Sequence, residues 1–211
     1  MSAPQGGARA EALNCPACGA PVALAHRFVK MVVCGHCGST LAVQDDRLDP
    51  TGKTAALAEL PTRFHIGARG AVRGRPFRIL GRVRLTTEDG PWDEWYLAFD
   101  DGAVAWLEEE EGGYTLAHPE PLRTPVPSFD EARLGTTFTV NGQNFFVTER
   151  CRAKVAGAEG QLFFRVVPGR EVRFLDGNLG GRTAAIEYGE DAIEYTVGEP
   201  LRRDDVTLDG E

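Results

Sequence analysis

The chain lacks the sequence features of a membrane-anchored or secreted protein. None of its apolar runs approaches the roughly 18–20 residues of a membrane-spanning helix. Its first residues, MSAPQGGARAEALN, have neither the basic start nor the apolar stretch of a secretory signal. We therefore expect a cytoplasmic protein with no transmembrane segment.

Positive charge is also in short supply. The 211 residues contain 23 Lys and Arg against 31 Asp and Glu, which gives a net charge of −8 at pH 7. Proteins that neutralise nucleic-acid phosphates depend on an excess of Lys and Arg. The charge balance therefore argues against nucleic acid as the partner.

Cysteine is scarce, and its spacing is more informative than its number. The chain has five cysteines, of which four form two C-x-x-C pairs separated by fifteen residues: Cys15, Cys18, Cys34 and Cys37. Such pairs are typical of thiolates that hold a metal in a reducing compartment, whereas a disulfide scaffold is cysteine-dense. Two tight turns of this kind complete a tetrahedron of sulfurs with no open position, which describes a closed structural site.

Glycine follows the second cysteine of each pair, at Gly19 and Gly38, and permits the positive φ that such turns need. We therefore predict one structural Zn²⁺ per chain in a small zinc ribbon over residues 14–44. Iron of the rubredoxin type is the chemical alternative with the same ligands. His36 lies between two of the cysteines and is interpreted as a turn residue, because four thiolates already complete the ligand set.

The rest of the chain is punctuated by turns. It contains 25 Gly and 13 Pro, which favours short strands over long helices. Residues 77–85 alternate with period two, and further apolar runs at 95–99 and 104–107 follow turn residues. A last hairpin is expected between 185–188 and 192–197, turning at 189–191. The fold class is therefore predicted to be mainly β.

The β-rich region also repeats itself. A shift of 68 positions superposes four pairs: Gly67 on Gly135, Val72 on Val140, Gly74 on Gly142 and Phe77 on Phe145. Further along, a shift of 67 positions places 95–97 against 162–164. Two related strand meanders in one pseudo-symmetric domain are expected, and the alternative is chance alternation in a β-rich sequence.

These patterns divide the chain into five parts. Residues 1–13 are small and polar and are expected to be disordered. The ribbon, 14–44, is followed by a linker, 45–62, in which residues 54–60 are expected to form two helical turns before Pro61. The linker should separate the ribbon from a duplicated all-β domain over 63–200. An acidic tail, 201–211, ends the chain.

Arginine is concentrated on one predicted strand and its counterpart in the repeat. No acidic residue interrupts the stretch from 63 to 84, and an acidic stretch follows it. One interpretation is a solvated sheet face with cross-strand ion pairs. The other is an anion-binding or partner-binding face, built from five residues: Arg78, Arg82, Arg84, Arg150 and Arg152. On either interpretation, Arg78, Arg82 and Arg84 should project from one side of the strand because their positions are all even.

No catalytic set can be assembled from the remaining polar residues. His65 and His118 have no Ser-Asp or Cys partner at a recognisable spacing. Cys151 is expected to be a small apolar residue on the inward face of its strand, together with Phe145 and Val147.

One motif resembles a known family. The segment Trp92-Asp93-Glu94-Trp95-Tyr96-Leu97, followed by Phe99, Gly102 and Trp106-Leu107, resembles the bacterial family called domain of unknown function 4178. The resemblance covers roughly residues 64–200, and some members also resemble this chain in a cysteine-rich ribbon ahead of the domain. It carries over no catalytic residues. It implies an accessory role beside membrane-stress or polyamine-related proteins.

We therefore expect a zinc-binding, non-catalytic binding or adaptor protein with a protein partner. The alternative is an enzyme or enzyme subunit that uses the Arg-rich sheet face as an anion site. An enzyme should show a concave site with convergent polar groups, whereas an adaptor should show a flat or shallow surface. The sequence leaves the oligomeric state open.

Overall fold

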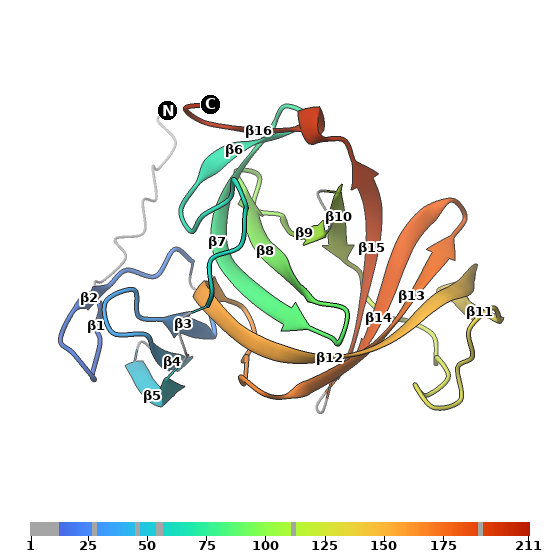
Figure 1. Cartoon of the computed structure of the whole chain (residues 1–211), viewed down its shortest axis with the longest axis horizontal. Coiled ribbons are helices and arrows are strands. Elements are labelled where there is room, and N and C mark those ends of the chain that lie inside the picture. The colour runs from blue at the N-terminus through green and yellow to red at the C-terminus, as the bar shows by residue number, and fades with distance from the viewer. Residues whose placement is uncertain (1–12, 27–28, 45–46, 54–56, 111–112, 190–191) are drawn as a thin grey trace, which may run out of the picture.

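The computed structural model describes residues 13–26, 29–44, 47–53, 57–110, 113–189 and 192–211 (Figure 1). Over these ranges the chain forms sixteen β-strands and one 3-10 helix, Arg203–Asp205, and contains no α-helix. No helix in these ranges has the length and hydropathy of a membrane span. The mainly-β prediction is confirmed.

The β domain is built from two successive five-strand meanders, followed by a short final strand. The first meander contains β6 (Arg69–Val72), β7 (Arg75–Thr86), β8 (Pro91–Phe99), β9 (Val104–Glu110) and β10 (Gly113–Pro119). The second contains β11 (Thr137–Val140), β12 (Gln143–Leu162), β13 (Glu171–Leu179), β14 (Arg182–Tyr188) and β15 (Ile193–Leu201). The predicted last hairpin corresponds to β14 and β15, although its turn residues 190–191 lie outside the described residues.

The strand pairing closes eight of these strands into a ring. The antiparallel order is β7-β8-β9-β10-β15-β14-β13-β12, and β12 pairs again with β7. The final strand, β16 (Val206–Leu208), pairs with β6 outside the ring. The C-terminal residues therefore differ from the predicted acidic tail, because this strand makes them part of the main sheet.

The backbone repeats itself at the predicted offset of 68 residues. Arg73 and Asn141 have positive φ angles of 48° and 49° in equivalent turns. The Gly67 N–H donates to the Ile79 carbonyl over 2.9 Å, and the Gly135 N–H donates to the Val147 carbonyl over the same distance. Each long strand also has a bulge at an equivalent place, directly after Ile79 and directly after Val147.

The residue offset between the two meanders increases after β12, because this strand is longer than β7. The predicted alignment of 95–97 with 162–164 is wrong, because Leu162 ends β12 while 95–97 lie inside β8. By strand order β8 corresponds to β13, and these strands begin at Pro91 and Glu171, an offset of 80 residues. The second meander therefore contains an insertion between the end of its long strand and its next strand.

The inserted part of β12 has two structural roles. Its residues from Lys154 to Gly160 pair with β7 and close the ring. Its last two residues, Gln161 and Leu162, pair with Val32 and Met31 of the ribbon. The insertion therefore joins the two meanders to each other and to the cysteine module.

Three strands of the ribbon extend the main sheet at one edge, and its first two strands form a separate two-stranded sheet. Its strands are β1 (Leu13–Asn14), β2 (Pro21–Val22), β3 (Met31–Val33), β4 (Ser39–Gln44) and β5 (Arg47–Lys53), with β3 attached to β12 (Figure 1). The predicted linker differs from this arrangement, because β5 falls within it and pairs with β4. Residues 57–60 are not helical, and 1–12, 45–46 and 54–56 lie outside the described residues.

The bulges in β7 and β12 reverse the alternation of side chains, so the apolar residues before and after each bulge pack in different cores. Phe77 and Ile79 belong to the core of the first meander, whereas Val83, beyond the bulge, belongs to the core inside the ring. In β12, Phe145 precedes the bulge and belongs to the core of the second meander. Cys151 follows it and contacts the ring core, so it does not share a face with Phe145 as predicted.

Ring closure depends on two glycines that face each other, Gly81 and Gly160. A Cβ at Gly81 would lie 2.4 Å from the Gln161 carbonyl oxygen. We expect Gly81→Ala to lower the free energy of unfolding by about 1–3 kcal/mol, because the strands must separate to admit the methyl group. Denaturant unfolding measures this change in the free energy of unfolding. Gly35→Ala is the control, since its Cβ would meet no atom within 4 Å, and an equal loss in both variants would contradict the prediction.

Candidate metal centre

Two nearly identical turns present the four cysteines. In each turn the glycine after the second cysteine donates its N–H to the first cysteine's carbonyl over 2.8 Å, from Gly19 to Cys15 and from Gly38 to Cys34. The two glycines have φ angles of 75° and 71°, a region in which a Cβ is unfavourable. The sequence prediction that these glycines shape the turns is consistent with this geometry.

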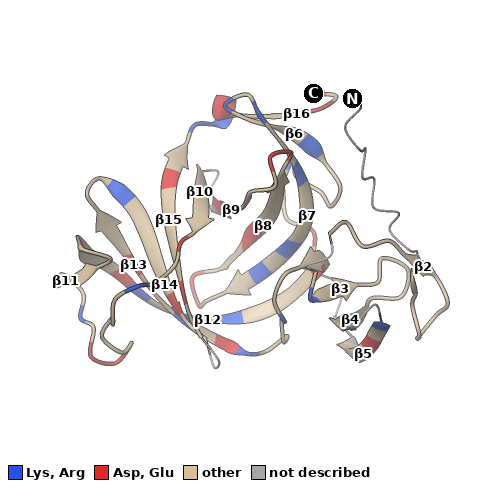
Figure 2. Ribbon diagram, turned by 180° about the vertical axis from the view of Figure 1, so that it is seen from behind, with Lys and Arg blue, Asp and Glu red and all other residues tan. Residues whose placement is uncertain are grey.

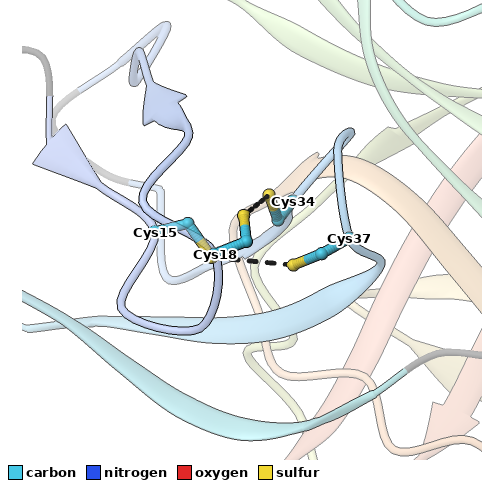
Figure 3. A group of neighbouring side chains, drawn as sticks. All are labelled: Cys15, Cys18, Cys34 and Cys37. Atoms are coloured by element: carbon cyan, nitrogen blue, oxygen red, sulfur yellow. Dashed lines mark hydrogen bonds between the residues drawn. The ribbon is translucent and has the colours of Figure 1, made fainter.

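The two turns place their sulfurs in one cluster (Figure 3). The Sγ atoms of Cys15 and Cys37 are 3.8 Å apart, as are those of Cys18 and Cys34, and all four lie within 4.8 Å of one another. A tetrahedral site with Zn–S bonds of about 2.3 Å has sulfurs about 3.8 Å apart. The donor set and its spacing therefore fit a tetrahedral thiolate-bound metal ion.

The protonation of the cluster also favours a cation. The Ser39 hydroxyl and the Ser39 N–H lower the pKa of Cys37 to about 6. The Ala20 N–H favours the Cys18 thiolate, but desolvation and the three other sulfurs outweigh it and raise the pKa of Cys18 to about 12. Four adjacent thiolates repel one another, so a bound cation is what would hold all four deprotonated. His36 is exposed and lies outside the cluster.

The ribbon that carries the cysteine turns contacts the ring through hydrogen bonds and core packing. Gln161 accepts a hydrogen bond from the Ala25 N–H over 2.7 Å and donates one to the Ala23 carbonyl over 2.9 Å. Met31 is 2% exposed in the ring core and accepts a hydrogen bond from the Val166 N–H. Gln161 was missed by sequence reasoning, because nothing in its neighbourhood marks it as a contact to residues 136 or more positions away.

The predicted Arg-rich face is divided between two sides of β7. Arg78 is exposed, whereas Arg82 and Arg84 are 8% and 3% exposed. The bulge after Ile79 reverses the alternation, so even-numbered positions beyond it turn to the opposite face. The structure therefore differs from the expectation that all three arginines project from one side of the strand. Figure 2 shows the basic residues of β7 beside acidic residues of the neighbouring strand β8.

Arg82 and Arg84 are neutralised by a carboxylate that sequence reasoning did not select. Asp93, itself 3% exposed, accepts two hydrogen bonds from Arg84, at 2.7 and 2.6 Å, and one from Arg82 at 3.3 Å. Arg82 also donates to Glu159 over 2.8 Å, and Arg84 donates to the Ala58 carbonyl. These arginines are therefore part of the folded interior and are not available to an external anion.

The inside of the ring carries a second group of carboxylates. Glu94 lies directly opposite Glu108, and Glu187 lies directly opposite Glu194. Burial, followed by the charge of Glu108, raises the pKa of Glu94 well above its ordinary value. Burial, followed by the charge of Glu194, raises the pKa of Glu187 to about 7. These opposed pairs therefore favour at least partial protonation near neutral pH.

The Asp93 network yields a stability prediction. Asp93→Asn removes the shared carboxylate and leaves two buried guanidinium groups without it, so we expect a loss of about 3–5 kcal/mol in the free energy of unfolding. Asp101→Asn is the matched control. Asp101 pairs with Arg75, and their side chains are 56% and 38% exposed, so the loss of this pair should change the free energy of unfolding far less. Similar denaturation midpoints for both variants would contradict a buried role for Asp93.

The raised pKa of Glu187 yields a pH prediction. The folded chain holds this proton up to about pH 7, whereas a Glu of ordinary pKa 4.5 loses it earlier. Between these values the folded state binds more protons than the unfolded state, so wild-type stability should fall as pH rises. Glu187→Gln should therefore be more stable than wild type by about 1–3 kcal/mol at pH 8, with little difference near pH 4.5.

The difference between the two proteins is measured by denaturant unfolding at each pH, so metal release at low pH affects both. Glu199→Gln provides a control, because its exposed carboxylate pairs with Arg73 at the surface. A difference between wild type and Glu187→Gln that does not change with pH would contradict the prediction.

The fold and the cysteine cluster define an all-β protein with an N-terminal four-cysteine ribbon. The profile of the family described as "Domain of unknown function (DUF4178)" matches residues 65–203, more than half of the chain, and the chain belongs to this family. The resemblance drawn from the Trp92–Leu97 motif is thereby confirmed. Searches of curated proteins and of solved structures found no match.

Proposed function

We propose that this chain is a non-catalytic binding or adaptor protein of the bacterial cytoplasm, whose ribbon holds one structural Zn²⁺. The observation that carries the zinc assignment is the thiolate cluster, with its two 3.8 Å sulfur pairs on duplicate turns. A closed four-thiolate site has no open coordination position for a substrate, so the metal would stabilise the ribbon rather than catalyse a reaction.

The surface supports a binding role. Two open hollows, of about 270 and 350 Å³, lie beside β16, and about half of the residues that line them are charged. Neither includes a Cys, His or Ser that could act as a nucleophile or general base. An accessory role beside membrane-stress or polyamine-related proteins, with a protein partner, is the form of this proposal that the family resemblance suggests.

The alternative, an enzyme or enzyme subunit with an anion site on the Arg-rich face, is weakened for the first meander. Arg82 and Arg84 already bind Asp93, and Arg78 lies on the other face. Arg78 is exposed but does not share a face with Arg82 and Arg84, whereas Arg150 and Arg152 of the second meander are both exposed.

The metal assignment is tested by elemental analysis of freshly purified, reduced protein. We expect about one zinc ion per chain, its loss in Cys34→Ala, and no visible absorbance of the kind that thiolate-bound iron produces. Cys151→Ala is the control, since Cys151 lies in the β domain outside the cluster. Protein that contains no metal, or that contains stoichiometric iron, would contradict the zinc proposal.

Metal removal should also loosen backbone segments outside the two cysteine turns. Because β3 pairs with β12, chelation should increase amide hydrogen exchange in residues 31–33 and also in 160–166. Affinity capture from the native organism with wild type and Cys34→Ala then tests the adaptor role, since a partner held through this edge should be lost with the metal.

A further inference from the structure

The two meanders place the same pair of arginines at equivalent positions. The offset of 68 residues superposes Arg82 on Arg150 and Arg84 on Arg152, in matching segments of β7 and β12. The cross-strand neighbours differ. Arg84 lies opposite Asp93, whereas Arg152 lies opposite Arg173. The position that holds a carboxylate in the first meander therefore holds a third guanidinium in the second.

The first meander shows what this arrangement binds. There the Asp93 carboxylate receives hydrogen bonds from both arginines, at distances between 2.6 and 3.3 Å. Arg82 also lies over the Trp95 ring, with its guanidinium carbon 5.0 Å from the ring centroid. An aromatic ring and a shared oxyanion together hold the two guanidinium groups in place.

In the second meander the aromatic ring is present, but no carboxylate among the described residues is shared by the arginines. Phe129 lies under three guanidinium carbons, at 4.7 Å from Arg150, 4.9 Å from Arg152 and 5.8 Å from Arg173. Arg150 donates to the Phe129 carbonyl over 2.8 Å. Each guanidinium carries five N–H donors, and these contacts leave several of them available for an anion.

The acidic neighbours of this cluster serve only one of its members. Arg152 pairs with Asp130 at 3.3 Å and with Glu171 at 3.0 Å, and these carboxylates are 74% and 49% exposed. Arg173 is half-buried and makes no ion pair with any residue that the structure describes. Like charges directly opposite each other on neighbouring strands destabilise a sheet, and a bound anion would remove this cost.

We propose that Arg150, Arg152 and Arg173 form a binding site for an external oxyanion of the phosphate type, which takes the place that Asp93 occupies in the first meander. Three guanidinium groups in place of two favour a doubly charged phosphate over a carboxylate. The phosphate can belong to a soluble phosphate compound or to a lipid headgroup. This inference rests on the proposed binding role and names the chemistry of the ligand.

Arg173→Asp provides the sharpest test, because it rebuilds the first meander's carboxylate in the second. Pyrophosphate is the soluble probe, followed by isothermal titration calorimetry at low and high salt. We expect salt-sensitive binding to wild type, a loss of about tenfold or more in Arg173→Asp, and a higher melting temperature for the variant without ligand.

The lipid source is tested by sedimentation with phosphatidylcholine vesicles that contain or lack a phosphatidylinositol phosphate. Binding of pyrophosphate without vesicle binding indicates a soluble ligand, whereas binding only to the phosphoinositide vesicles indicates a headgroup. Absence of both overturns the proposal.

Arg173→Gln and Arg78→Gln form a matched pair that keeps the test decisive if Arg173→Asp fails to fold. Each removes one positive charge, but Arg78 is an exposed residue on the first meander, away from Phe129. Weaker binding in Arg173→Gln alone supports the site. Equal weakening in both variants reveals a general charge effect and overturns it. Zinc content and partner capture are measured in separate experiments. A protein that binds no phosphate would therefore contradict the anion site without contradicting the proposed zinc-binding adaptor role.

Discussion

The antiparallel pairing of β7 with β12 is the contact on which the rest of the structure depends. It closes eight strands into a ring, and it is possible only because Gly81 and Gly160 face each other without side chains. The same strand continues for two residues and pairs with the ribbon. One inserted segment therefore fixes the relation between two meanders and a metal-binding module, and the ribbon cannot lose its fold without disturbing the ring core around Met31.

The charges follow from the same geometry. A bulge after Ile79 turns Arg82 and Arg84 to the face of β7 opposite Val83, where they are buried and a shared carboxylate makes their burial tolerable. The equivalent bulge in β12 brings Arg150 and Arg152 to the corresponding face, but the loop that contains Phe129 covers them less completely. The two meanders thus contain the same pair of arginines in two settings. The first pair is buried around the Asp93 carboxylate, and the second pair is exposed.

Much of this could be predicted from the sequence, and the failures have physical reasons. The four-cysteine cluster was predictable because C-x-x-C spacing and the following glycines constrain short turns, whose geometry is local. The period-two pattern located β7, β8 and β9 for the same reason. The faces of Arg82, Arg84 and Cys151 were wrong, because a single extra residue reverses every later position and leaves no mark in composition. The ribbon's attachment was missed because it depends on pairing between distant segments.

The comparison between the two meanders also supports the proposal that the second pair of arginines binds an external anion, whereas the first pair stabilises the fold. A buried carboxylate that binds two arginines within 3.3 Å outcompetes any ligand from solution, since it is already desolvated and held in place. Where Arg173 replaces the carboxylate, the described residues include no buried carboxylate that the arginines share, and Arg152 is paired with two exposed carboxylates. Preorganisation without an internal partner is the condition under which an external anion gains most from binding. The first meander therefore serves as the structural reference for the anion site that we propose in the second, where Arg173 stands in place of Asp93.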